Sequence, residues 1–177
     1  MEKFKIVVMG VSGCGKSLIG SQLAKALQIN FFDGDDYHPE FNIQKMSQGM
    51  PLNDDDRDEW LNTLNTLINE QQQAVIACSA LTPKYRAILK KGAPNLQFVY
   101  LKGDFDTIWQ RHQKRENHYF NGQTMLKNQF DTLIEPSSTE ALIVDIRQSV
   151  EQIVADIQAQ LSVAAILSTG NSKTNNE

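Results

Sequence analysis

The sequence predicts an α/β protein whose parallel sheet is covered by helices on both faces. Short, continuous apolar runs alternate with segments in which apolar residues recur every three or four positions. A continuous apolar run is typical of a strand that is buried on both faces, as in a parallel sheet. A glycine-rich stretch follows the first of these runs and leads directly into a helical pattern. Ligands of such sheets bind at the carboxyl ends of the strands.

The expected strands are the short apolar runs, and each ends in small or polar residues. The third run, Ala-Val-Ile-Ala-Cys, contains no polar residue at all, which is typical of a strand buried on both faces. The five predicted strands cover residues 4–9, 30–33, 74–78, 96–101 and 141–145.

The expected helices begin at capping residues and end near glycines. Thr82 followed by Pro83 is typical of an N-cap and the first helical residue, and Asp104 can cap the next helix. Three successive carboxylates at 54–56 suit a helix N-terminus, while Gly92 suits a helix end. The predicted helices cover residues 18–27, 42–48, about 53–68, 83–91, 105–112, about 125–133 and 150–161.

The 177 residues are expected to form one domain over residues 1–162, with a disordered tail over 163–177. The net charge of −4 and the lack of a long Lys/Arg cluster argue against a nucleic-acid partner. No apolar stretch approaches the roughly 20 residues of a membrane span. Two cysteines make no disulfide framework, and the chain enters a strand with no room for a signal peptide. A cytoplasmic protein without a membrane partner is expected.

Residues 10–17, Gly-Val-Ser-Gly-Cys-Gly-Lys-Ser, spell a complete phosphate-binding loop (P-loop) between the first strand and a helix. Its glycines allow a tight turn and a close backbone approach to phosphate. Its lysine supplies charge for the β- and γ-phosphates of a nucleoside triphosphate, and its serine hydroxyl suits Mg²⁺. The cysteine is expected to fill the loop rather than to act as a redox switch. The expected nucleotide-binding residues are therefore Gly10, Gly13, Cys14, Gly15, Lys16 and Ser17.

Two carboxylates, Asp33 and Asp35, end the second predicted strand. Asp33 can support the Mg²⁺ shell together with Ser17. Asp35 can accept a hydroxyl proton, which is the base role in phosphoryl transfer. An acidic turn that merely caps a helix is an equally good interpretation of these two residues alone.

Three further residues suit an acceptor molecule. Arg57 can clamp a carboxylate with two hydrogen bonds, or it can form a surface ion pair with Asp54 or Asp58. His38 can hydrogen-bond a hydroxyl or cap a loop. Ser79 lies among small residues at a strand end, where a ligand can approach closely or the chain can simply pack tightly.

Arg111 and Arg115 are spaced i, i+4 and are expected to share one helix face. Such a pair can stack on adenine and neutralise charge on a transferred phosphoryl group, or it can be an ordinary solvated face. The neighbouring His112 is expected to be a surface or packing residue.

The sequence resembles the bacterial gluconokinase family over about residues 5–160. The segments at 51–57 and 78–81 are far more specific for this family than the P-loop, which many families share. Two departures occur: the segment at 117–123 is one residue longer than usual, and Ser149 stands where a proline is expected. The matching segments are residues 10–17, 33–39, 42–46, 51–61, 78–86, 99–103 and 129–136.

The resemblance implies a three-layer fold like that of nucleoside monophosphate kinases, with sheet order 2-3-1-4-5 and a lid at about 115–124. It implies ATP- and Mg²⁺-dependent phosphorylation of D-gluconate at its 6-hydroxyl, with Asp35 and Arg57 on the sugar acid. Arg111 would stack on adenine, Arg115 would act from the lid, and the protein would be a homodimer. A related kinase of shikimate or adenylylsulfate is the first alternative. A nucleotide-operated switch is the second, and the lack of an Asn-Lys-x-Asp guanine-reading sequence argues against it.

Overall fold

A computed structural model describes residues 4–114 and 122–170. It contains one five-stranded sheet in the order β2-β3-β1-β4-β5, in which all neighbouring strands are parallel. This confirms the predicted fold class and strand order. The strands are β1 (Lys5–Met9), β2 (Asn30–Asp33), β3 (Ala74–Ala77), β4 (Leu96–Lys102) and β5 (Ala141–Asp145).

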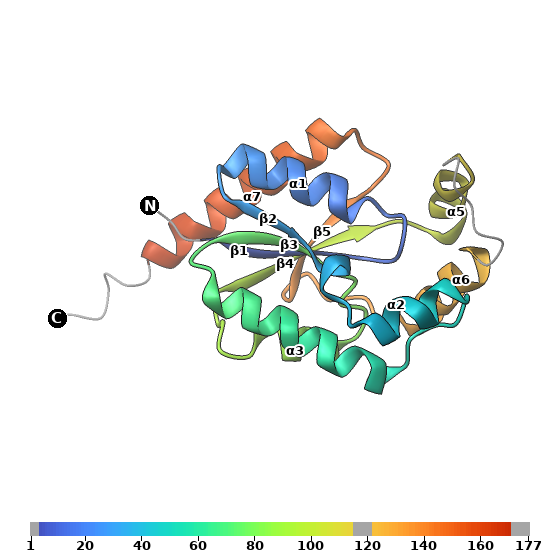
Figure 1. The fold of residues 1–177 in the computed structure, drawn as a ribbon. Helices are drawn as coiled ribbons and strands as arrows, with labels where there is room; N and C mark the ends of the chain where they lie inside the picture. The colour runs from blue at the N-terminus through green and yellow to red at the C-terminus, as the bar shows by residue number, and fades with distance from the viewer. Residues whose placement is uncertain (1–3, 115–121, 171–177) are drawn as a thin grey trace.

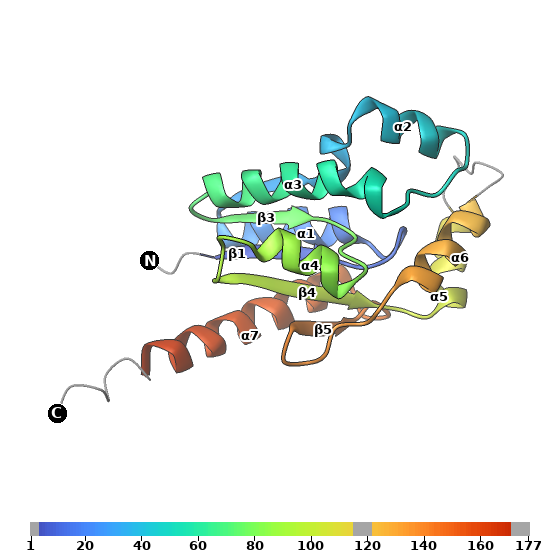
Figure 2. The same cartoon turned by 90° about the horizontal axis from the view of Figure 1, so that it is seen from below.

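Helices cover the sheet on both faces (Figures 1 and 2). One layer consists of α1 (Lys16–Leu27) and α7 (Val150–Gly170), and the other of α3 (Asp54–Glu70) and α4 (Pro83–Lys90). The remaining helical segments gather beyond the carboxyl ends of the strands. They are the 3-10 turn η1 (Gly34–Tyr37), α2 (Glu40–Ser47), α5 (Phe105–Gln113) and α6 (Gly122–Thr132).

The predicted helix caps are present and explain where three helices begin. Asn53 and Asp56 form a reciprocal capping box at the start of α3, with hydrogen bonds of 2.8 and 2.9 Å. Thr82 Oγ1 accepts a hydrogen bond from Tyr85 N, and Asp104 Oδ1 accepts one from Thr107 N. These caps satisfy backbone donors that would otherwise lack partners.

The core lies on both sides of the central strands. Residues 6–9 of β1 and 74–76 of β3 are completely inaccessible to solvent, and Lys5 pairs with Ala74 in their register. Leu23 from α1 and Leu64 from α3 close the two faces. Burial of each Val, Leu, Ile or Met side chain among these contributes about 1.5–3 kcal/mol. The strand ends that carry the polar residues are therefore anchored in a well-packed core.

Three predicted boundaries were wrong. Helix α2 begins at Glu40 rather than at residue 42, because Pro39 is its N-cap. Helix α6 begins at Gly122 rather than at about residue 125, so the predicted polar break ends before residue 124; the first turn of the helix is polar and gives no apolar signal. Helix α7 continues to Gly170, which contradicts the expected disorder of residues 163–170, where alanines and leucine favour a helix. Residues 115–121 of the expected lid and 171–177 of the expected tail lie outside the described residues.

In the described ranges, 4–114 and 122–170, none of the helices combines the length and apolar character that crossing a membrane requires.

Candidate active site

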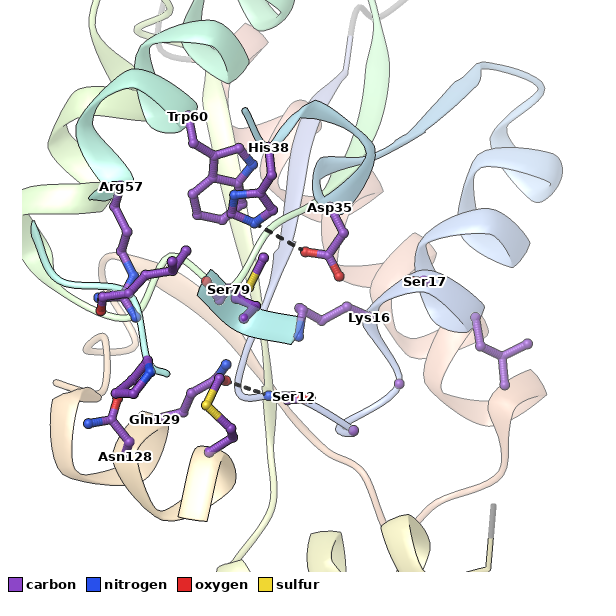
Figure 3. A pocket seen from close by; sticks show the side chains of 17 residues that line it. Ser12, Lys16, Ser17, Asp35, His38, Arg57, Trp60, Ser79, Asn128 and Gln129 are labelled. Atoms are coloured by element: carbon purple, nitrogen blue, oxygen red, sulfur yellow. Dashed lines mark hydrogen bonds and ion pairs between the residues drawn. The ribbon is translucent and has the colours of Figure 1, made fainter. Parts of the chain in front are cut away.

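A cavity of about 400 Å³ opens where the strands end (Figure 3). The P-loop forms one wall, η1 and the start of α3 form another, and α6 closes a third. Most of the residues predicted from the sequence meet here. The predicted residues that line the cavity are Gly13, Gly15, Lys16, Ser17, Asp35, His38, Arg57 and Ser79.

The P-loop glycines have the backbone conformations that the motif predicts. Gly10, Gly13 and Gly15 all have positive φ, at 146°, 80° and 101°. A side chain at Gly13 would also collide with His112, because its Cβ would lie 2.3 Å from the imidazole Nε2. The loop is joined to the end of β3 by a hydrogen bond from Gly10 N to Ser79 O of 3.3 Å. This hydrogen bond fixes the position of the P-loop relative to Ser79.

Ser17 and Asp33, the two residues predicted to support Mg²⁺, contact each other directly. The Ser17 hydroxyl donates a hydrogen bond of 2.5 Å to Asp33 Oδ2. Asp33 Oδ1 accepts from Asp35 N at 3.1 Å, which fixes the carboxylate at the start of η1. A hydroxyl and a carboxylate are hard oxygen donors of the kind that Mg²⁺ prefers. The pair therefore fits a magnesium ion that binds beside the phosphates.

Lys16 and Cys14 belong to the same loop but differ in environment. The ammonium group of Lys16 lines the cavity and donates a 3.0 Å hydrogen bond to Val11 O. Cys14 is buried and does not line the cavity, and burial raises the pKa of its thiol. This agrees with its predicted role as a packing residue of the loop.

Asp35 and His38 face the cavity across from Lys16 (Figure 3). The Asp35 carboxylate is mostly exposed, and its Oδ1 lies 3.8 Å from His38 Nε2. His38 Nδ1 accepts a 3.4 Å hydrogen bond from the amide of buried Asn42, which leaves Nε2 as the protonated nitrogen of the neutral ring. Burial lowers the pKa of His38 and Arg57 lowers it further, although Asp35 acts in the opposite direction. His38 therefore presents an N–H group to the cavity.

Arg57 is a buried cation on the cavity wall, with 7% of its surface exposed. Its Nη1 donates to Leu52 O at 2.6 Å and to the Tyr85 hydroxyl at 3.3 Å, and its guanidinium lies over the Tyr85 ring. The alternative of a surface ion pair with Asp54 or Asp58 was wrong. Within the described part of the chain the guanidinium forms no ion pair, and Asp54 instead binds Lys84 and Tyr85.

Of the two arginines predicted near the lid, the structure describes Arg111 but not Arg115. Arg111 lies on α5, and its Nη2 donates a 2.5 Å hydrogen bond to Ile146 O, just after β5. Its proposed stacking on adenine stays a prediction. Arg115 lies outside the described residues, and α5 already ends at Gln113.

Several contacts in the site were not predicted. Trp60 of α3 stacks against His38 and donates its Nε1–H to Gly34 O at 2.7 Å. Gln129 of α6 binds Ser12 of the P-loop. Its only sequence signal was its place in a segment that resembles the gluconokinase family. His112, predicted as a surface or packing residue, also packs against the P-loop, where its Nε2 lies 3.1 Å from Ser12 O.

Arg86 is a second buried arginine that the periodicity did not reveal. Its Nε and Nη2 donate to the Glu140 carboxylate at 2.7 and 3.3 Å, and its Nη1 donates to Ala80 O at 3.0 Å. Ala80 itself has a positive φ of 46°, which is uncommon for a residue with a side chain. Arg86 thus supports the strained turn that presents Ser79.

Known proteins resemble this chain over almost all of its length. Residues 12–162 match the family model of shikimate kinase. The thermoresistant gluconokinase of Escherichia coli (strain K12) is 50% identical over 84% of this chain and 88% of its own length. A gluconokinase structure from Sinorhizobium meliloti 1021 superimposes with a TM-score of 0.89 at 38% identity, covering 97% of this chain and 99% of its own.

More distant structures share the fold alone. The shikimate kinase of Aquifex aeolicus is 18% identical and has a TM-score of 0.65, with 92% of this chain and 98% of its own covered. The level of identity thus separates gluconokinases from the wider group of small kinases built on this fold. The chain belongs to the gluconokinase family, within the P-loop kinases that the shikimate kinase model describes.

Proposed function

We propose that this protein transfers the terminal phosphoryl group of ATP to the 6-hydroxyl of D-gluconate, giving 6-phosphogluconate and ADP. The observation that carries the proposal is the juxtaposition of Arg57, Asp35 and Lys16 on one cavity. A buried guanidinium without a counter-ion is unfavourable, so an anionic ligand would stabilise it. Gluconate has a carboxylate for this role and a chain of hydroxyl groups. Membership of the gluconokinase family supports the same substrate.

The donor half is formed by the P-loop and its neighbours. Backbone N–H groups of the loop cradle the phosphates, and Lys16 neutralises charge on the β- and γ-phosphates. Ser17 and Asp33 would hold Mg²⁺, which neutralises developing charge on the phosphate oxygens when bound. Arg111 is proposed to stack on adenine, and Arg115 to add positive charge near the transferred group.

The acceptor half lies opposite the loop. Arg57 binds the gluconate carboxylate, while the N–H of His38 and the hydroxyl of Ser79 hydrogen-bond the sugar-acid hydroxyls. Asp35 removes the proton from the 6-hydroxyl as that oxygen forms its bond to the γ-phosphorus. The bond from the γ-phosphorus to the bridging oxygen breaks, and ADP leaves with that electron pair.

A coupled assay for ADP over a panel of acceptors tests this proposal. The panel contains D-gluconate, related aldonic acids, shikimate and adenylylsulfate, each with ATP and Mg²⁺. Turnover of gluconate at least a hundred times faster than of shikimate or adenylylsulfate is expected. Faster turnover of either of these acceptors would refute the proposed substrate. Nucleotide binding without phosphate transfer to any acceptor would favour the nucleotide-operated switch instead.

The predicted homodimer and cytoplasmic location are part of the same proposal. Light scattering on the purified protein should give twice the mass of one chain. Fractionation of the source cells should recover the protein with cytoplasmic markers. A monomer in solution would remove the dimer from the proposal without affecting the chemistry.

A further inference from the structure

Gln129 of α6 accepts a hydrogen bond from a backbone N–H group of the P-loop that could otherwise bind phosphate. Its Oε1 accepts a hydrogen bond of 2.6 Å from Ser12 N, although the residues lie 117 positions apart in the chain. Figure 3 shows this contact as a dashed line at the edge of the cavity. The backbone N–H groups of a P-loop are the groups that bind phosphate oxygens. The amide oxygen of Gln129 therefore takes a position that suits a phosphate oxygen.

The Ser12 peptide is also held from its other side. A carbonyl oxygen can only accept, so His112 Nε2 donates the 3.1 Å hydrogen bond to Ser12 O. His112 lies on α5, and its ring packs so closely on Gly13 that no side chain fits there. The Ser12 N–H group is thus aimed in one direction, and any other acceptor has to replace Gln129 where it now lies.

The γ-phosphate is the group that suits this position. The loop cradles the α- and β-phosphates, and Lys16 reaches the β- and γ-phosphates. Ser12 lines the cavity together with Gln129 and with Asp35 of the acceptor side. The terminal phosphoryl group has to lie between the loop and the acceptor, which brings its oxygens toward Ser12 N. ADP has no phosphate to place there.

We propose that Gln129 is a positioning residue that competes with the γ-phosphate of ATP for Ser12 N–H. The inference rests on the proposed function only in taking ATP as the donor. A charged phosphate oxygen is a stronger acceptor than a neutral amide oxygen, so ATP displaces Gln129 while ADP leaves it in place. The Gln129 side chain therefore reports the presence of a transferable phosphoryl group.

Titration calorimetry with the non-hydrolysable analogue AMP-PNP and with ADP, in the presence of Mg²⁺ and without gluconate, tests this competition. Gln129→Ala removes the competitor and should tighten AMP-PNP binding about two- to tenfold, the worth of one hydrogen bond. Gln129→Glu supplies a charged competitor and should weaken AMP-PNP binding at least tenfold. ADP affinity should change less than twofold in Gln129→Ala and much less than AMP-PNP affinity in Gln129→Glu.

Asn128 offers matched controls, since it lines the same cavity one position away and has no hydrogen bond to the loop among the described contacts. Asn128→Ala should leave both affinities unchanged, and Asn128→Glu measures general repulsion between a carboxylate and the nucleotide. Weaker AMP-PNP binding in Gln129→Ala, or equal shifts for AMP-PNP and ADP, would overturn the inference and indicate a purely structural contact. The calorimetry contains no sugar acid, so its outcome does not depend on the acceptor. If the wild-type protein phosphorylated no sugar acid in the coupled assay, the proposed substrate would be refuted, but the competition between Gln129 and ATP would not.

Discussion

The imidazole of His38 lies flat against the indole of Trp60, with ring centroids 4.1 Å apart and an interplanar angle of 17°. The same indole donates to Gly34 O, so it also fixes the start of η1. The stacked pair joins α3 to the turn that presents Asp35. The His38 side chain is consequently a buried part of the acceptor wall, and its protonation state affects the stability of the folded protein.

Acidification should destabilise the protein through His38. Burial lowers the pKa of His38 from its ordinary value of 6.5, so below about pH 6.5 the unfolded chain binds more protons than the folded chain. The contribution of neutral His38 to the free energy of unfolding is therefore fully present above that pH, and it is lost as the pH falls toward the pKa of His38 in the folded state. Urea unfolding at pH 7.5, 6.5 and 5.5 should give a smaller loss in His38→Gln than in the wild type. Equal losses in both proteins would contradict this assignment.

Asp35→Asn should lower kcat by about 10²- to 10⁴-fold, the usual contribution of a general base. ATP affinity should stay within about threefold of wild type, because Asp35 faces the acceptor and its backbone, not its carboxylate, binds Asp33. Steady-state kinetics and nucleotide titration measure the two quantities. Asp36→Asn is the matched control, since Asp36 is an exposed neighbour outside the cavity. An equal loss in both variants would show that the effect is one of general charge.

Arg57→Met should raise the KM for gluconate by about 30-fold or more, because the substrate carboxylate would lose its buried partner. The KM for ATP should stay close to the wild-type value. Arg147→Met provides the control, since this exposed arginine pairs with Asp145 away from the cavity. An unchanged KM for gluconate would remove Arg57 from the carboxylate site.

Arg86→Met should lower the free energy of unfolding by about 3 kcal/mol. The substitution leaves Ala80 O and Ile134 O without their donor and the Glu140 carboxylate without its cation. Urea unfolding measures the change. Lys127→Met removes an exposed ion pair with Asp131 and should cost about 0.5 kcal/mol or less. Similar losses in the two variants would contradict a special role for Arg86.

Neither cysteine should react with iodoacetamide in the native protein at pH 8. Burial raises the pKa of Cys78 to about 12 and also raises that of Cys14, so neither provides thiolate at this pH. Mass spectrometry should find both thiols unmodified in buffer and both alkylated in urea. Rapid alkylation of Cys14 in the folded state would show that the P-loop opens.

The strand-end residues could be predicted because each lies beside the local pattern that identifies it. Ser17 follows the P-loop glycines and Asp33 ends a predicted strand, so the sequence predicts both at the same edge of the sheet. The contacts from Gln129 to Ser12 and from Arg86 to Glu140 span long stretches of chain, and no local period encodes such pairs. Helix α7 extends past its predicted end because residues 163–167 are apolar and continue the helix, whereas the polar residues that indicated a disordered tail begin only at residue 168.

Most of the acceptor wall comes from one stretch of chain, residues 34–60, which contains Asp35, His38, Arg57 and Trp60. This stretch runs from the end of β2 through η1 and α2 into the first part of α3, whereas the nucleotide loop connects β1 to α1. Strands β2 and β3 pair directly, with Asp33 beside Ala77, so the stretch begins at a fixed position on the sheet edge. The two halves of the site thus lie on different connections of one sheet: residues 34–60 form most of the acceptor wall, and the loop between β1 and α1 forms the nucleotide side. Substitutions confined to residues 34–60 are therefore expected to change acceptor binding more than nucleotide binding.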